Sequence, residues 1–89
     1  MKTSSTFNVK KHTSCLLITR SEQDSERKIR VTPFKTRADH TFTVEQFVRD
    51  PIEREVQLLQ FRGYHIFCKE NHSDKYFLAV PIDKVEEKP

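Results

Sequence analysis

Gly63 is the only glycine in this chain of 89 residues, and the spacing of apolar residues differs on its two sides. Before it, apolar residues from position 44 to position 59 recur with a helical period. After it, residues 64 to 69 and 75 to 82 alternate with period two, which is typical of strands. A helix that ends at Gly63 and leads into a hairpin is therefore the strongest constraint on the fold, since glycine readily adopts the left-handed conformation that closes a helix.

A second hairpin is predicted earlier in the chain, over residues 13 to 32. Residues 6 to 20 favour extended structure, and we expect one strand there with an irregularity around Lys11-His12. Residues 27 to 32 alternate again, and Pro33 is expected to end that pattern.

The helix between the two hairpins has two start signals. Thr43 begins a Thr-x-x-Gln capping box, and Pro51 follows an aspartate as the first residue of a second helix start. Proline inside a helix removes a hydrogen bond and clashes with the preceding turn. We therefore predict a short helix over residues 44 to 49 that kinks into a longer one over residues 51 to 62, with a shared buried face.

These elements predict an α+β fold with the order β-β-α-β-β. A four-stranded, mainly antiparallel sheet with one kinked helix packed on a face is the simplest architecture for it. The last strand is apolar on both faces, which indicates a central position, and Pro81 should end it. We expect a single small domain over residues 1 to 82 and a charged tail over residues 83 to 89 that frays.

Composition limits the class of protein. The content of 35% hydrophobic and 33% charged residues suits a small folded domain, and the longest apolar runs are far too short to span a bilayer. No apolar segment follows the N-terminal lysine, so we expect no cleaved leader and a cytoplasmic location with reduced cysteines. A bridge between Cys15 and Cys68 stays open at this point.

The net charge of +3 conceals an uneven distribution along the chain. Residues 1 to 20 have four basic and no acidic residues, and residues 27 to 40 have five basic residues against Asp39. Between these two segments, Glu22, Asp24 and Glu26 form an acidic insert, so the first 40 residues sum to +5 and the remaining 49 to −2. The candidate phosphate-contacting residues lie on the first hairpin and its flanks: Lys10, Lys11, Arg20, Arg27, Lys28, Arg30, Lys35 and Arg37.

Arg62-Gly63-Tyr64 matches only the beginning of an RNA-recognition strand pattern, basic-Gly-aromatic. Isoleucine and lysine follow at positions where that pattern needs aromatic residues. A helix cap followed by a core strand is therefore the favoured interpretation of this stretch.

Two histidines and two cysteines, in His12-x-x-Cys15 and Cys68-x-x-x-His72, equal the ligand number of a structural zinc site. Residues three apart on a strand point to opposite faces, so His12 and Cys15 could bind one metal only through a tight turn, and we expect no metal site. We also expect no cofactor, since one glycine cannot form a phosphate-binding loop.

The same geometry separates Cys68 from His65, and a Cys-His pair with His72 would lie on a turn. With Asp39-His40 as the only other acid-base pair, and one glycine to shape a substrate loop, we predict a protein that is not an enzyme.

Two binding functions remain. The leading hypothesis is contact with nucleic-acid backbone through the basic N-terminal hairpin, in which Phe34 and Phe42 either stack on bases or close the core. The alternative is a protein-binding adaptor or regulator that uses an apolar sheet face left uncovered by the helix, with a homodimer as one form of it. Its candidate residues are Phe67, Phe77 and Phe61.

Overall fold

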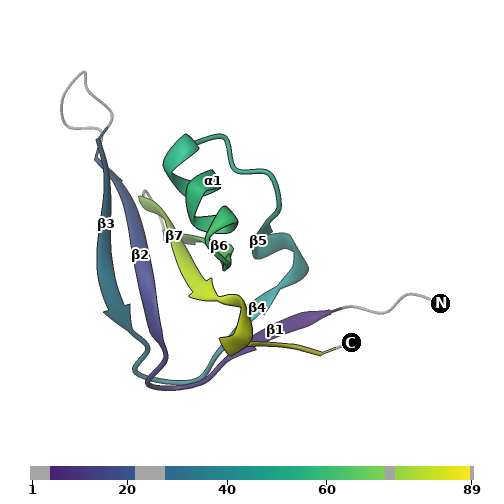
Figure 1. The fold of residues 1–89 in the computed structure, drawn as a ribbon. Coiled ribbons are helices and arrows are strands. Elements are labelled where there is room, and N and C mark those ends of the chain that lie inside the picture. Colours follow the sequence, from purple (N-terminus) through teal and green to yellow (C-terminus); the bar gives the residue numbers. More distant parts are fainter. Residues whose placement is uncertain (1–4, 22–27, 72–73, 89) are drawn as a thin grey trace.

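The computed structural model describes residues 5–21, 28–71 and 74–88, and the side chains of these except at positions 21, 28, 70, 71, 74 and 75. The described residues form two antiparallel sheets and one α-helix (Figure 1). The larger sheet has the strand order β3-β2-β7-β6-β5, and the smaller one has the order β4-β1-β8. The α+β class and the antiparallel pairing are thus confirmed, whereas the single four-stranded sheet is wrong.

Both predicted hairpins belong to the five-stranded sheet. Its strands are β2 (Ser14–Ser21), β3 (Lys28–Lys35), β5 (Phe47–Val48), β6 (Tyr64–Asn71) and β7 (Asp74–Pro81). β7 lies between β2 and β6, which explains why it is apolar on both faces, and it ends at Pro81 as expected. Pro33 does not end β3, which continues to Lys35, because an edge strand has one side without a partner strand and tolerates proline.

The three-stranded sheet was not predicted. It contains β1 (Thr6–Val9), β4 (His40–Thr43) and β8 (Val85–Lys88). The expected single strand over residues 6 to 20 is therefore two strands in different sheets, separated by a turn at which His12 has a φ of 67°. The expected frayed tail is also wrong for residues 85 to 88, which pair with β1 and place the half-buried Val85 opposite the buried Val9.

The kinked helix is wrong as well. The Thr43 capping box is present, but it begins only a 3-10 turn, η1 (Val44–Gln46), after which β5 pairs with β6. Within the described residues the single α-helix is α1 (Arg54–Phe61), preceded by Glu53 as its N-cap. Gly63 follows its C-cap with a φ of 98°, and its N–H donates to the Gln60 carbonyl at 3.1 Å, so the predicted left-handed end of the helix is confirmed.

The core has two parts, one on each face of the five-stranded sheet. On the helix face, Val56 and Leu59 of α1 pack against Ile18, Ile66 and Ala79. The opposite face, called the inner face here, packs against the three-stranded sheet, whose Phe7 and Phe42 contact Phe67 with ring centroids 5.4 and 4.4 Å apart. The second sheet therefore covers the apolar face that one helix cannot cover.

Candidate nucleic-acid interface

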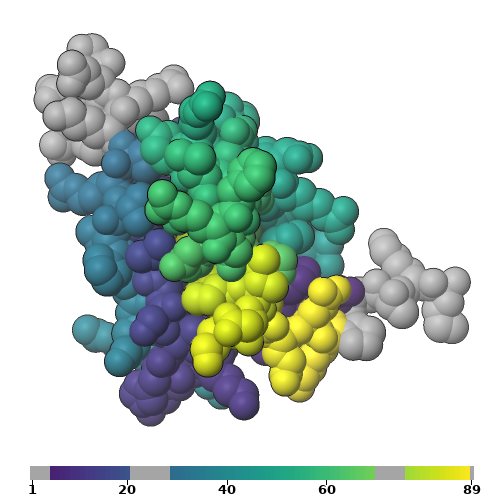
Figure 2. Space-filling model, viewed as in Figure 1, coloured from purple at the N-terminus to yellow at the C-terminus, as the bar shows by residue number. Residues whose placement is uncertain are grey.

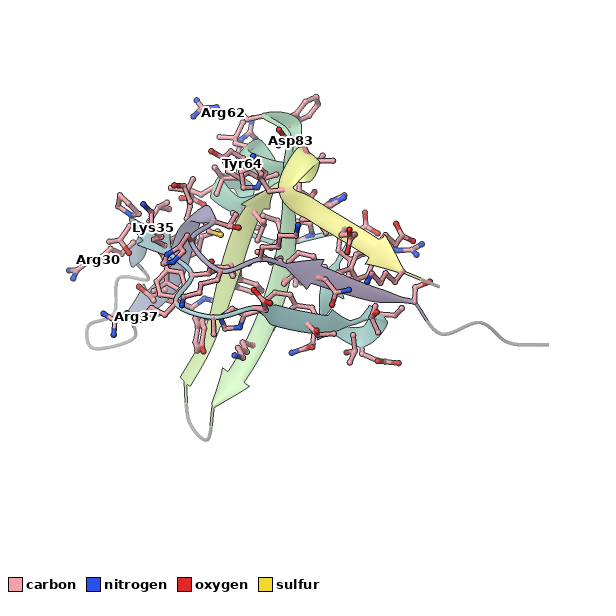
Figure 3. All side chains as sticks on the ribbon, turned by 90° about the horizontal axis from the view of Figure 1, so that it is seen from below. Arg30, Lys35, Arg37, Arg62, Tyr64 and Asp83 are labelled. Atoms are coloured by element: carbon pink, nitrogen blue, oxygen red, sulfur yellow. The ribbon has the colours of Figure 1, made fainter. Side chains whose placement is uncertain are left out.

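Five of the eight predicted basic residues are exposed and lie along β3 and the turns at its C-terminal end. We call this set, Lys10, Lys11, Arg30, Lys35 and Arg37, the basic strip. The two lysines come from the β1–β2 turn, Arg30 and Lys35 from β3, and Arg37 from the β3–β4 connection. Figure 3 shows Arg30, Lys35 and Arg37 on the same side of the molecule, away from Arg62 and Asp83. Within the described part of the chain, none of the five forms an ion pair.

Hydrogen bonds between the two turns hold the C-terminal end of the strip in place. The His12 N–H donates to the Thr36 carbonyl at 2.8 Å, and the Thr36 N–H donates to the Thr13 carbonyl at 3.1 Å. The Thr36 hydroxyl accepts from the Thr13 N–H at 2.8 Å and donates to the Lys10 carbonyl at 2.7 Å. Thr13 and Thr36 are both buried, so this network fixes the backbone that presents the basic side chains.

An open groove lies beside this corner. It has a volume of about 510 Å³ and is lined by His12, Pro33, Phe34, Lys35, Thr36 and Arg37. Its wall thus combines two basic side chains with an imidazole and one aromatic ring. Such a surface can bind a phosphate and an adjoining flat, apolar group.

Apart from Asp39, the exposed acidic side chains that the structure describes lie on other parts of the molecule. Exposed carboxylates are found on η1, around α1, and on η2 (Ile82–Lys84) and β8. Figure 2 shows β3 on the left flank in blue and the C-terminal segment at the lower right in yellow. Asp39 is the acidic residue near the strip, and its Oδ1 accepts the Lys11 N–H at 2.8 Å. The described exposed carboxylates therefore weaken the positive potential of the strip little.

Three predicted basic residues do not belong to the described strip. Arg20 lies on the helix face and forms a salt bridge with Glu53, next to α1, so a described carboxylate already neutralises its charge. Arg27 lies outside the described residues. For Lys28 the structure describes the backbone in β3 but not the side chain.

The two phenylalanines flanking the strip have different environments. Phe42 is 2% exposed and stacks on Phe67, so it belongs to the core and cannot stack on a base. Phe34 is half-buried, packs against the same core cluster and lines the groove. One of the two therefore remains a candidate for base contact.

The apolar sheet face proposed for a protein partner is covered. Phe67 is 0% exposed beneath the three-stranded sheet, and Phe77 packs in the cluster under α1. The expectation that both lie on an uncovered face is wrong because two layers, not one, pack on the sheet. Phe61 is different, since it is 92% exposed at the end of α1.

The described cysteines and histidines do not gather into a metal site. Cys15 is buried and unbridged, whereas His12 is exposed. Burial raises the pKa of the Cys15 thiol to about 11, so it stays protonated at neutral pH. Among the described residues no group of three or more His, Cys, Asp or Glu side chains is placed to hold a metal, and His72 lies outside them.

The candidate acid-base histidines His65 and His40 lie next to phenylalanine rings. His65 lies on the inner face among Phe7, Phe47 and Phe67, while Cys68 lies on the opposite face of β6. Burial lowers the pKa of His65, and the charge of Glu87 opposes that shift. His40 stacks on Phe42.

Within the described part of the chain, no helix is long and apolar enough to cross a membrane.

Sequence reasoning missed four residues that now belong to the basic surface or support it. Thr13 and Thr36 position the corner, and no local pattern marks them as a pair because they lie 23 positions apart. Tyr76 and Lys69 lie directly opposite each other on β7 and β6. The period-two alternation of residues in β7 predicts on which face of the strand Tyr76 lies. It does not predict which part of that face the second sheet leaves uncovered.

Comparison of the chain with known proteins finds no matching family model, no matching curated protein and no matching solved structure. A function must therefore be inferred from the residues of this chain and their arrangement.

Proposed function

We propose that this protein is a non-enzymatic nucleic-acid-binding module whose basic strip contacts the phosphate backbone. The observation that supports this proposal best is the gathering of Lys10, Lys11, Arg30, Lys35 and Arg37 from three segments onto one edge, exposed and without ion-pair partners among the described residues. A solvated surface charge that served only solubility would not need to be clustered.

The spacing of the strip suits an extended ligand. Arg30 and Lys35 are five residues apart on the edge strand β3, so their side chains point to opposite faces of the sheet and their backbones are about 17 Å apart at the usual rise of a strand. Lys10, Lys11 and Arg37 extend the strip beyond the end of β3, where the threonine network holds the two turns together. A polyanion lying along this edge can therefore meet several cations in succession.

The proposal predicts a salt-dependent affinity. If each of the five cations neutralises one phosphate, the slope of log K against log salt should be about −3.5 for a single strand and about −4.5 for a duplex. The measurement is a fluorescence-anisotropy titration with labelled DNA and RNA oligonucleotides at several salt concentrations.

A pair of double variants separates local charge from net charge. Lys35→Glu with Arg37→Glu reverses two charges in the strip. Arg62→Glu with Lys84→Glu makes the same change in net charge near the far end of α1, where the Ile82 N–H donates to the Gly63 carbonyl. The strip variant should weaken binding at least about tenfold and reduce the slope by about 1.4 for a single strand, while the control changes it little.

The proposal fails if no oligonucleotide binds at low salt. It also fails if both double variants weaken binding equally, since that result would show a response to net charge without a site. Circular dichroism and urea unfolding of both variants verify that each remains folded.

A protein partner is the second candidate function, and the exposed side of α1 supports it. Phe61 is 92% exposed and Leu58, three positions earlier on the same side of the helix, is 49% exposed. In the homodimer form of this candidate, light scattering should give a dimeric mass that Phe61→Ser with Leu58→Ser reduces to that of the monomer. A monomeric mass of the unchanged chain at high concentration would rule out this form.

We also propose that the protein acts in the cytoplasm. The unbridged thiol of Cys15 suits a reducing compartment, and no described cysteine pair requires an oxidising one.

A further inference from the structure

A row of four side chains crosses the inner face of the five-stranded sheet near its hairpin ends. Arg30 of β3 pairs with Thr19 of β2, Thr19 pairs with Tyr76 of β7, and Tyr76 pairs with Lys69 of β6. Side chains at directly paired positions lie on the same face of a sheet. The row therefore places an aromatic ring between two cations.

This part of the inner face is accessible. Two residues further along the strands, toward the three-stranded sheet, Phe67 and Leu78 are buried. In the row itself Arg30 is exposed, and Thr19, Tyr76 and Lys69 are only partly buried. Figure 3 shows the hairpin end of β6 and β7 extending past β1 and β4, so the second sheet covers one half of this face and leaves the other half uncovered by described residues.

The row places the Tyr76 ring between two long basic side chains. Neighbouring strands are about 4.8 Å apart, so the backbones of Arg30 and Lys69 are separated by about 14 Å, with Tyr76 between them and closer to Lys69. Neither cation forms an ion pair within the described residues, and the Tyr76 ring has no aromatic partner there. Both kinds of group are thus available to a ligand.

From this arrangement we infer that the row binds single-stranded nucleic acid, with a base stacked on Tyr76 and phosphates on Arg30 and Lys69. The inference rests on the proposed backbone-binding function and names its ligand more closely. Arg30 belongs to both the row and the basic strip, so one strand can continue from the inner face onto the edge of β3. A duplex cannot stack on Tyr76, because its bases already stack on one another.

The aromatic composition of the chain provides a direct test. The sequence has two tyrosines and no tryptophan, so in a Tyr64→Phe variant Tyr76 is the sole tyrosine emitter. Tyr64 packs at the helix-face cluster, away from the row. Addition of an unlabelled single-stranded DNA or RNA oligonucleotide should quench this emission strongly, whereas a duplex of the same sequence bound to the same extent should quench it little.

Affinity measurements make the second part of the test. Tyr76→Leu should weaken single-strand binding about tenfold, while Tyr76→Phe, which keeps the ring, should change it less than threefold. Duplex binding should be nearly the same in the unchanged protein, in Tyr76→Leu and in Tyr76→Phe. Urea unfolding of each variant shows whether its fold is retained. The quenching measurement does not depend on a Tyr76 variant, because it is made with the Tyr76 side chain intact.

The outcomes separate this inference from the proposed function. If single strands bind and depend on Lys35 and Arg37, but Tyr76 is not quenched and Tyr76→Leu binds normally, the stacking row is wrong and backbone binding stands. If no oligonucleotide binds, both are wrong. Quenching together with a specific loss in Tyr76→Leu supports the row.

Discussion

Phe67 and Phe61 are the same residue type in opposite environments, so truncating each of them tests the two-sheet core. Phe67 is 0% exposed and its ring lies 4.4 Å from Phe42, 5.4 Å from Phe7 and 5.7 Å from Phe47, centroid to centroid. Phe61 is 92% exposed. The substitution Phe67→Ala should therefore act on the core that joins the sheets, and Phe61→Ala should not.

The expected effects differ by several kcal/mol. Removing a buried phenylalanine ring costs about 3 to 5 kcal/mol, and the loss of its aromatic pairs places Phe67 near the upper end of that range. A chain of this length has about 4 to 13 kcal/mol of net stability, so Phe67→Ala removes much of it. A surface substitution such as Phe61→Ala should change the free energy of unfolding by less than about 0.5 kcal/mol.

Urea unfolding followed by circular dichroism measures both effects. If Phe67→Ala is already unfolded without urea, Phe67→Leu gives a measurable loss of about 1 to 2 kcal/mol because it removes fewer atoms. Equal midpoints for the Phe67 and Phe61 variants would refute the reasoning, since they would show that the second sheet does not cover Phe67.

Three further predictions concern His65 and Cys15, two titratable groups on the inner face. Burial lowers the pKa of His65 below its usual 6.5, so the neutral ring stabilises the fold above that pH. This contribution is lost as the pH falls through the lower pKa of the folded state, and His65→Gln should remove that part of the pH dependence in urea unfolding. Glu87→Gln should lower the pKa of His65 further in an NMR titration, and an unchanged or raised value would contradict the assignment. In a Cys68→Ser variant, Cys15 should react with iodoacetamide only as fast as the protein opens, because the thiol is buried and its pKa is about 11. Reaction at the rate of a free thiol in the folded protein would show that Cys15 is accessible.

Local sequence patterns were sufficient to predict the elements whose pairing partners are close in the chain. The β2–β3 and β6–β7 hairpins follow from period-two alternation, since antiparallel neighbours joined by a short connection need no distant information. Gly63 marked the end of α1 because only a left-handed residue closes a helix in that way. The basic character of the β3 side was likewise visible from the order of charges.

The same kind of pattern failed for residues 44 to 53. Their apolar positions keep the helical phase, but Phe47 and Val48 pair with the edge of β6 instead. Ile52 is 90% exposed, and among the apolar residues predicted to share one buried helical face only Val56 and Leu59, both in α1, are buried. Tertiary pairing at a sheet edge thus prevailed over helical periodicity in a short segment.

The sequence by itself determined the strands of the two hairpins, the end of the helix and the part of the chain in which positive charge accumulates. These properties depend on neighbours within a few residues. Only the tertiary structure decided that β1, β4 and β8 form a second sheet, since Val9 pairs with His40 and Val85, which are distant in sequence. That second sheet buries Phe67 and leaves Tyr76 accessible on the same face. The candidate surface therefore arises from where one sheet stops covering the other, and long-range packing decides that boundary.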